Sequence, residues 1–193
     1  MVIYCKMGCS FLPKKLTLAG LVLAVAFPAG MWLLQPRPAL VVEETRGART
    51  VWAVPAREGE TFYLRYIHSV NRRRVEDTYR VLGGEIVLTE TRFEAQGAGL
   101  GYMGEGVESA RNGWTIISGL HRRLPVLYLR VGSIADHCLV IRDTEFHLWD
   151  RVPPFSLVAI RVRPLDRLHC WVISWRGQPG GYGGAQASGF LLR

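Results

Sequence analysis

Four polar residues have the side-chain types of a ligand-binding cluster, and they are His68, Asp77, Glu90 and Arg92. A carboxylate pair with an imidazole nearby can hold a divalent ion or a polar ligand. Strand pairing inferred from the hydrophobic pattern places all four on the inner face of one sheet, with Asp77 directly opposite Glu90. Two opposed carboxylates repel each other unless a cation, Arg92 or a shared proton offsets the repulsion. We therefore predict a ligand- or partner-binding site here; the alternative is a solvated sheet end at which Arg92 neutralises both acids.

The residue types of a serine hydrolase also occur together, as His68, Ser69 and Glu76. Adjacent residues on a strand point to opposite faces of a sheet, so Ser69 cannot easily meet His68. The inferred pairing also places Glu76 on the face opposite His68, and the sequence has no GxSxG motif to expose a nucleophilic serine. No catalytic residue is therefore predicted. An enzyme that uses His68, Asp77 and Glu90, hydrolytic or metal-dependent, is the alternative to a binding function.

A glycine-rich segment contains the pattern GxGxxG at residues 99–104. A dinucleotide-binding fingerprint needs a helix after this loop, whereas another strand is expected here, so no cofactor is predicted. Gly97 and Gly99 are kept as candidate ligand- or partner-binding residues, because backbone amides in a bent loop can cap an anion; a simple bend between strands is the alternative. The histidines show neither HxxxH nor HExxH spacing, so no zinc motif is predicted.

Three strands must position these residues, at 61–70, 75–82 and 85–93. Apolar and polar side chains alternate along each of them, which is typical of strands with one buried face. Gly83 and Gly84 predict a tight hairpin between the second and third strands. Matching apolar residues across the strands places Tyr79 opposite Leu64 on one side and opposite Leu88 on the other. The expected inner face consists of Phe62, Leu64, Tyr66, Tyr79, Val81, Ile86 and Leu88.

The rest of the chain also shows short alternating segments. Hydrophobic residues make up 49% of the chain, and 21 glycines and 10 prolines are too many for a helical bundle. Further strands are expected at 39–45, 50–54, 113–118, 125–132, 137–142, 144–148 and 157–163. The predicted fold is all-β, an antiparallel sandwich or partly closed barrel of roughly eight to ten short strands. A short helical turn is expected near 148–152, and a turn at residues 143–144.

The N-terminal segment has the pattern of a membrane anchor or signal peptide. Residues 16–34 are 19 consecutive uncharged residues, and Lys14 and Lys15 precede them. This length just spans a hydrocarbon core of about 30 Å. The lysines place residues 1–15 in the cytoplasm and export a domain at 39–163, whether the segment stays as an inner-membrane anchor or is cleaved. Residues 164–193 are predicted as a partly disordered tail.

Export affects the interpretation of the cysteines and the charge. In an oxidising compartment Cys138 and Cys170 can form a disulfide. The net charge of +8 includes an arginine run at 72–74. Aromatic and lysine platforms for nucleic acid are missing, so a solvated turn is favoured and no nucleic-acid partner is predicted.

The tryptophans are expected to pack in the core; an exposed cluster of them would indicate an interface.

Five sequence blocks in order resemble one family. They are YIHSV (66–70), VEDTY (75–79), ETRFEAQGAGL (90–100), LPVLYLRVGSIADHCLVI (124–141) and LVAIRV (157–162). Together they resemble the bacterial domain-of-unknown-function family 1850, over residues 39–163. The resemblance implies a small exported or anchored protein encoded beside a TAXI-type TRAP transporter, with the permease or its solute-binding protein as the partner. It implies no biochemical activity.

Overall fold

The computed structural model describes residues 14–94, 105–132 and 134–176, with side chains for 20–94, 105–132 and 134–175. The chain divides into two units, Met1–Gln35 and Pro36–Arg193. In the first unit, the segment predicted as anchor or signal lies in helix α1, Lys14–Leu34, which contains Pro28. Within the described residues, no helix combines the length and the apolar character needed to cross a membrane.

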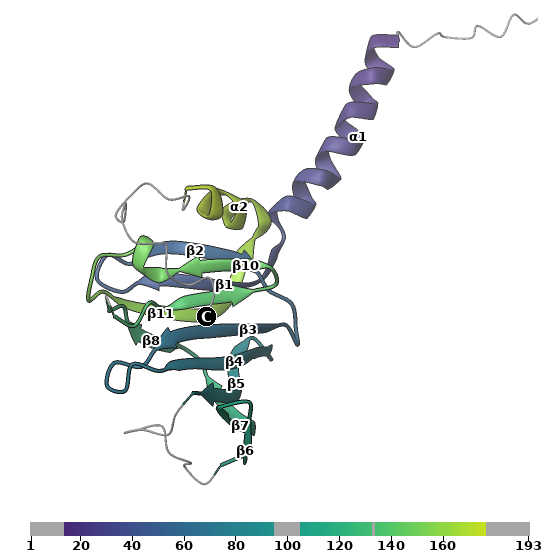
Figure 1. The fold of residues 1–193 in the computed structure, drawn as a ribbon. Helices are drawn as coiled ribbons and strands as arrows, with labels where there is room; N and C mark the ends of the chain where they lie inside the picture. The colour runs from purple at the N-terminus through teal and green to yellow at the C-terminus, as the bar shows by residue number, and fades with distance from the viewer. Residues whose placement is uncertain (1–13, 95–104, 133, 177–193) are drawn as a thin grey trace, which may run out of the picture. The chain divides into compact units, whose positions relative to one another are not determined.

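The second unit is built from two antiparallel sheets (Figure 1). The four-stranded sheet has the order β2-β1-β11-β8, with β1 at Pro36–Glu44, β2 at Arg49–Pro55, β8 at Leu127–Arg130 and β11 at Leu157–Asp166. The seven-stranded sheet has the order β10-β9-β3-β4-β5-β7-β6. Its strands are β3 (Thr61–Ile67), β4 (Arg74–Leu82), β5 (Glu85–Phe93), β6 (Val107–Arg111), β7 (Trp114–Leu124), β9 (Cys138–Ile141) and β10 (Thr144–His147). The predicted antiparallel β fold is confirmed, and the sheets do not close into a barrel.

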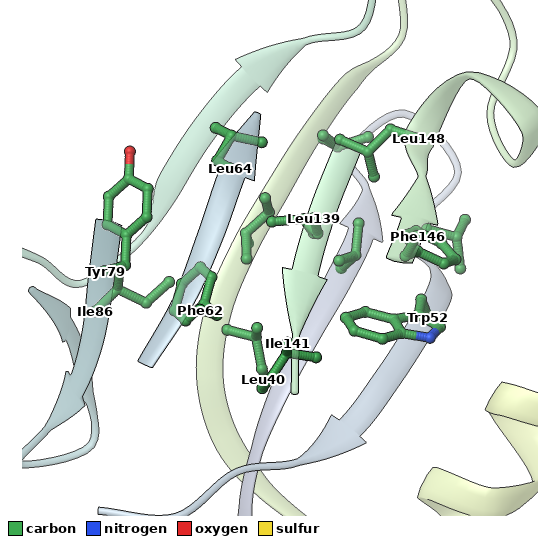
Figure 2. Close-up of a cluster of buried hydrophobic side chains, with 14 of the residues drawn as sticks. Leu40, Trp52, Phe62, Leu64, Tyr79, Ile86, Leu139, Ile141, Phe146 and Leu148 are labelled. Carbon is green, nitrogen blue, oxygen red and sulfur yellow. The ribbon is translucent and has the colours of Figure 1, made fainter. Parts of the chain in front are cut away.

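One hydrophobic core lies between the two sheets, because both contribute apolar side chains to it (Figure 2). Leu40 and Ile160 come from the four-stranded sheet, whereas Phe62 and Tyr79 come from the seven-stranded sheet and stack with ring centroids 5.2 Å apart. Trp52 stacks on Phe146 at 4.6 Å and connects the same two layers. Burying each such side chain stabilises the fold by about 1.5–3 kcal/mol. The opposite face of the seven-stranded sheet, here called the outer face, is therefore left for polar side chains.

The predicted meander forms as strands β3, β4 and β5. Gly83 and Gly84 have φ angles of +61° and +76°, the left-handed conformation that a tight hairpin turn favours. Tyr79 lies opposite Leu88 as predicted. Tyr79 is only 3% exposed, so the predicted inner face is correct at this position.

Two details of the strand pairing differ from the prediction. Phe62, and not Leu64, lies opposite Tyr79, so β3 and β4 pair two residues away from the predicted register. A β-bulge after Thr78 then sets Thr78 opposite Glu90 and leaves Asp77 opposite Thr91. A shift of two residues keeps every side chain on its face, because side chains alternate with a period of two. The single extra residue of the bulge moves the end of β5 to the opposite face.

The C-terminal part contains a helix that the sequence analysis did not predict. The segment from residue 164, predicted as a partly disordered tail, begins with the end of β11 and continues as helix α2, Arg167–Arg176. Asp166 caps the helix, since its Oδ1 accepts a hydrogen bond from the His169 amide at 2.8 Å. Cys170 and Ile173 of α2 pack against β1 and β2. The expected helical turn near 148–152 is present as η1, Leu148–Asp150.

Trp171 and Trp175 correct the expectation that the tryptophans pack in the core. Both lie on α2, their side chains are 64% and 66% exposed, and their rings stack with centroids 6.4 Å apart. Leu168 is also exposed on this helix. A group of exposed Trp and Leu side chains is typical of an interaction surface.

Candidate functional site

The predicted cluster of His68, Asp77, Glu90 and Arg92 does not form, because the β-bulge separates its acidic members. Asp77 is on the inner face, where its carboxylate accepts hydrogen bonds from Thr91 Oγ1 at 2.5 Å and from the Tyr79 hydroxyl at 3.4 Å. Glu90 and Arg92 line the outer face instead. The proposed repulsion between Asp77 and Glu90 therefore does not exist, and Thr91 takes the place predicted for Glu90.

His68 lies in the turn between β3 and β4 and has local contacts. Its backbone amide donates to the Arg73 carbonyl at 2.9 Å, and its Nδ1 accepts from the Val70 amide at 3.3 Å. Arg72 adopts the left-handed φ of +53°, whereas Asn71 does not have a positive φ. Asn71 instead accepts a hydrogen bond from the Arg73 amide through its side chain. Gly97 and Gly99 lie outside the described residues.

The buried position of Asp77 leads to a first prediction. Burial raises the pKa of its carboxyl, although hydrogen bonds from Thr91, Tyr79 and Tyr66 oppose that rise. A carboxyl whose pKa is higher in the folded state than in the unfolded state destabilises the fold once the pH exceeds the unfolded value. Asp77→Asn should therefore leave the melting temperature at pH 7 equal to or higher than that of the wild type. The difference in melting temperature between variant and wild type should vanish as the pH falls through the pKa of Asp77 in the unfolded chain. Below that pH the aspartic acid is protonated, so the residue is neutral in both proteins.

Thermal unfolding between pH 3 and pH 8 checks this expectation. Asp143→Asn, at an exposed turn, is the matched control and should change nothing at any pH. A clear loss of stability in Asp77→Asn at pH 7 would show that the negative charge is needed where it lies.

The outer face contains the site that the structure does form, a hollow of about 680 Å³ that we call the outer hollow. Glu76 lies in it with only 6% of its surface exposed. Arg65 Nε is 2.7 Å from one oxygen of Glu76, and Arg92 Nη2 is 2.5 Å from the other. These residues lie directly opposite one another on three adjacent strands. The hollow is lined by Thr61, Tyr63, Arg65, Glu76, Thr78, Arg80, Thr89, Glu90, Arg92, Ser118, Gly119 and Leu120.

The charges in the outer hollow form a row across the sheet. Arg65 continues the row to Glu145 of β10, with Nη1 3.0 Å from its carboxylate. The hydrogen bond to Glu76 raises the pKa of the Arg65 guanidinium. Arg92 lies over the ring of Trp114, with its guanidinium carbon 5.2 Å from the centroid, a cation–π contact. Glu76 is thus fixed from both sides and both arginines are held in place.

A similar ion-pair arrangement on the other sheet shows that the row alone does not define a site. Glu43 of β1 is buried between Arg161 and Arg163 of β11. The outer hollow differs in two respects: it is concave, and two of its charged side chains form no ion pair within the described residues. Arg80 is exposed, and neither Arg80 nor Glu90 forms an ion pair with any part of the chain that the structure describes.

The side chains that line the outer hollow are suited to binding a polar partner. Its lining carries three arginines and two glutamates, together with five hydroxyl groups that can donate or accept hydrogen bonds. Arginine stays protonated in proteins and does not act as a general base at neutral pH. The arrangement can therefore recognise a polar or acidic partner through hydrogen bonds and ion pairs.

The predicted disulfide between Cys138 and Cys170 is not formed. Both cysteines are free and buried. Cys138 lies on β9 opposite Arg65 and His147, whereas Cys170 belongs to the cluster under α2. Burial raises the pKa of the Cys138 thiol to about 11.

Glu76 was not predicted as the centre of the site, and the neighbours of Cys138 were not predicted either. A signal for Glu76 was available, since only the observed register places a glutamate between two arginines on adjacent strands. Opposite charges directly across a strand pair are favourable, so this criterion would have selected the correct pairing.

Residues 62–148 match the model of a family described as a domain of unknown function, DUF1850. The segment contains Arg65, Glu76 and Arg92, and it confirms the family resemblance over a shorter range than the predicted 39–163. No curated protein matches the chain, and no solved structure matches it.

Proposed function

We propose that this protein is a non-catalytic β-sandwich binding domain held at, or released from, the outer side of the inner membrane. Its role is that of an accessory component of a TAXI-type TRAP transporter, and its partner is the permease or the solute-binding protein. The observation that carries the binding function is the outer hollow, a concave polar face. Two of its arginines, Arg65 and Arg92, are paired with Glu76, and the third, Arg80, is exposed. The family resemblance supports the choice of partner.

The charge of the outer hollow indicates the chemistry of the partner. Three arginines against two glutamates leave the lining positive, and Glu76 is already neutralised by two of the arginines. Arg80 is therefore the exposed charge that a partner meets first. Complementary potentials increase association rates and exclude wrong partners. An acidic surface on the transporter fits this face.

Two further features support a location at the membrane. Lys14 and Lys15 precede the 19 uncharged residues 16–34, a charge pattern that retains the N-terminus in the cytoplasm. In the second unit, Trp171 and Trp175 are exposed on α2 together with Leu168. Tryptophan is enriched where proteins meet the interfacial region of a bilayer. Exposed aromatic side chains of this kind suit a protein that works at a membrane surface.

The three residues of the alternative, an enzyme that uses His68, Asp77 and Glu90, do not lie together. Asp77 lies on the inner face of the sheet, where its carboxylate accepts hydrogen bonds from Thr91 and Tyr79. Glu90 lines the other face, and His68 is engaged with the turn backbone. The binding function therefore requires no contribution from these three residues as a group.

Co-purification of the full chain with the transporter subunits tests the proposal. Arg80→Glu reverses the exposed charge in the outer hollow without touching the ion pairs of Glu76. We expect it to reduce the recovered permease or solute-binding protein at least about tenfold, since repulsion at an interface costs several kcal/mol. Arg46→Glu makes the same charge change on an exposed turn of the other sheet and should leave recovery unchanged. Equal recovery with both variants would contradict the proposal.

A further inference from the structure

The β9–β10 hairpin brings together three side chains of metal-binding type. Cys138 lies directly opposite His147, and Glu145 is two residues before His147 and so shares its face. The ligand atoms of Cys138, Glu145 and His147 all lie within 4.8 Å of one another. These residues show no zinc-motif spacing in the sequence, because strand pairing brings them together.

The distances fit a tetrahedral transition-metal ion. Bonds of about 2.0–2.3 Å from zinc to nitrogen, oxygen and sulfur separate the ligand atoms by about 3.3–3.8 Å. Cys138 Sγ and His147 Nε2 are already 3.8 Å apart. Glu145 is exposed, so its carboxylate can rotate to close the remaining distance. One of its oxygens accepts a hydrogen bond from Arg65, which leaves the other oxygen for a metal.

A second carboxylate orients the histidine for this role. Asp136 Oδ1 is 3.4 Å from His147 Nδ1, while His147 Nε2 faces the sulfur of Cys138. Histidine ligands in metal sites commonly donate their second ring N–H to a carboxylate, which fixes the ring and the tautomer. The hairpin therefore presents three ligands, and Asp136, just before β9, supports one of them.

We propose that Cys138, Glu145 and His147 bind a divalent transition-metal ion, with zinc as the best match to a thiolate, imidazole and carboxylate set. On binding, the Cys138 thiol releases its proton to solvent as the sulfur–metal bond forms, and the metal remains divalent. Three protein ligands leave one coordination position open. The site does not depend on the proposed transporter role, but it lies next to the outer hollow, because Arg65 contacts both Glu145 and Glu76.

Titration of the full chain with Co²⁺ in a non-chelating reducing buffer tests this site. Co²⁺ bound to a thiolate gives a charge-transfer band in the near ultraviolet, which reports the Cys138 bond directly. We expect the band to saturate at one Co²⁺ per chain and to disappear when excess Zn²⁺, which favours tetrahedral sites with sulfur and nitrogen ligands, displaces the cobalt. Cys138→Ser should abolish the band. Asp136→Ala should weaken Co²⁺ binding about 10- to 100-fold, as expected for loss of a supporting carboxylate.

Control variants separate this site from the other cysteines. Cys170→Ser, and a chain with Cys5→Ser and Cys9→Ser, should retain the band at full intensity. If Cys138→Ser fails to fold by circular dichroism, His147→Ala decides, because His147 is only partly buried and should weaken binding more than tenfold in a folded chain. A band that persists in folded Cys138→Ser or at full affinity in His147→Ala would overturn the proposal. So would a folded wild type that gives no band.

Discussion

Replacement of Tyr79 by alanine is expected to lower the free energy of unfolding by about 3–5 kcal/mol, the range for removal of a buried aromatic side chain. Tyr79 is 3% exposed and stacks on Phe62 in the core between the sheets. The side chain also carries a hydroxyl that donates to Asp77, so its loss leaves that carboxylate with one fewer partner. Urea-induced unfolding monitored by circular dichroism measures the change.

Arg80→Ala is the matched control for Tyr79→Ala, because it removes the next side chain on the same strand. Arg80 is exposed on the outer face, so its truncation should cost less than about 1 kcal/mol. If Arg80→Ala proved the more costly change, β4 would be turned over by one residue and the outer hollow would not exist as described.

Glu76→Gln is expected to lower the free energy of unfolding by about 2 kcal/mol. Removing one member of a buried ion pair costs about 3–5 kcal/mol when the partner charge stays buried. The side chains of Arg65 and Arg92 are 43% and 40% exposed, so solvent compensates part of that loss and the lower figure applies. The same urea unfolding experiment reports the effect.

Glu85→Gln provides the comparison for Glu76→Gln. Glu85 pairs with Arg123 on the surface, at 3.2 Å, and such a pair contributes less than about 1 kcal/mol. The effect at Glu85 should shrink with added salt, whereas the effect at Glu76 should persist, because buried pairs are screened less. Equal and equally salt-sensitive effects would mean that Glu76 does not organise the outer hollow.

The sequence predicts the faces of the strands well. Alternation of apolar residues places Phe62, Tyr79 and Ile86 in the core, and the glycine pair at 83–84 fixes the register of β4 and β5 near the turn. These features depend on neighbours in the chain and on a burial pattern with a period of two. Local rules therefore suffice for them.

The pairing of β3 with β4 could not be chosen on hydrophobic pattern alone. A shift of two residues leaves every side chain on the same face, so both registers bury the same residues. The β-bulge did leave a trace in the sequence, since the apolar positions of β5 change from even to odd numbers between Leu88 and Phe93. This change of parity is what moves Glu90 and Arg92 to the face of Glu76.

The cluster at Cys138 was not predicted because the expected position of one turn was wrong by a single residue. A turn expected at residues 143–144 is observed one position earlier, with Ile141 opposite Thr144. Only the observed turn sets Cys138 opposite His147. Helix α2 was missed for another reason: it packs on β1 and β2, which are more than a hundred residues earlier in the chain, and no local pattern encodes that contact.

Site-specific photo-cross-linking in intact cells tests the central claim, that the outer hollow is the binding face. A photoreactive amino acid at position 78 replaces Thr78 in the lining of the outer hollow, and the same amino acid at position 46 replaces an exposed arginine of the β1–β2 turn. We expect position 78 to form a covalent adduct with the permease or the solute-binding protein of the transporter, and position 46 to form none. An adduct at position 46 without one at position 78, or equal yields at both, would contradict the account.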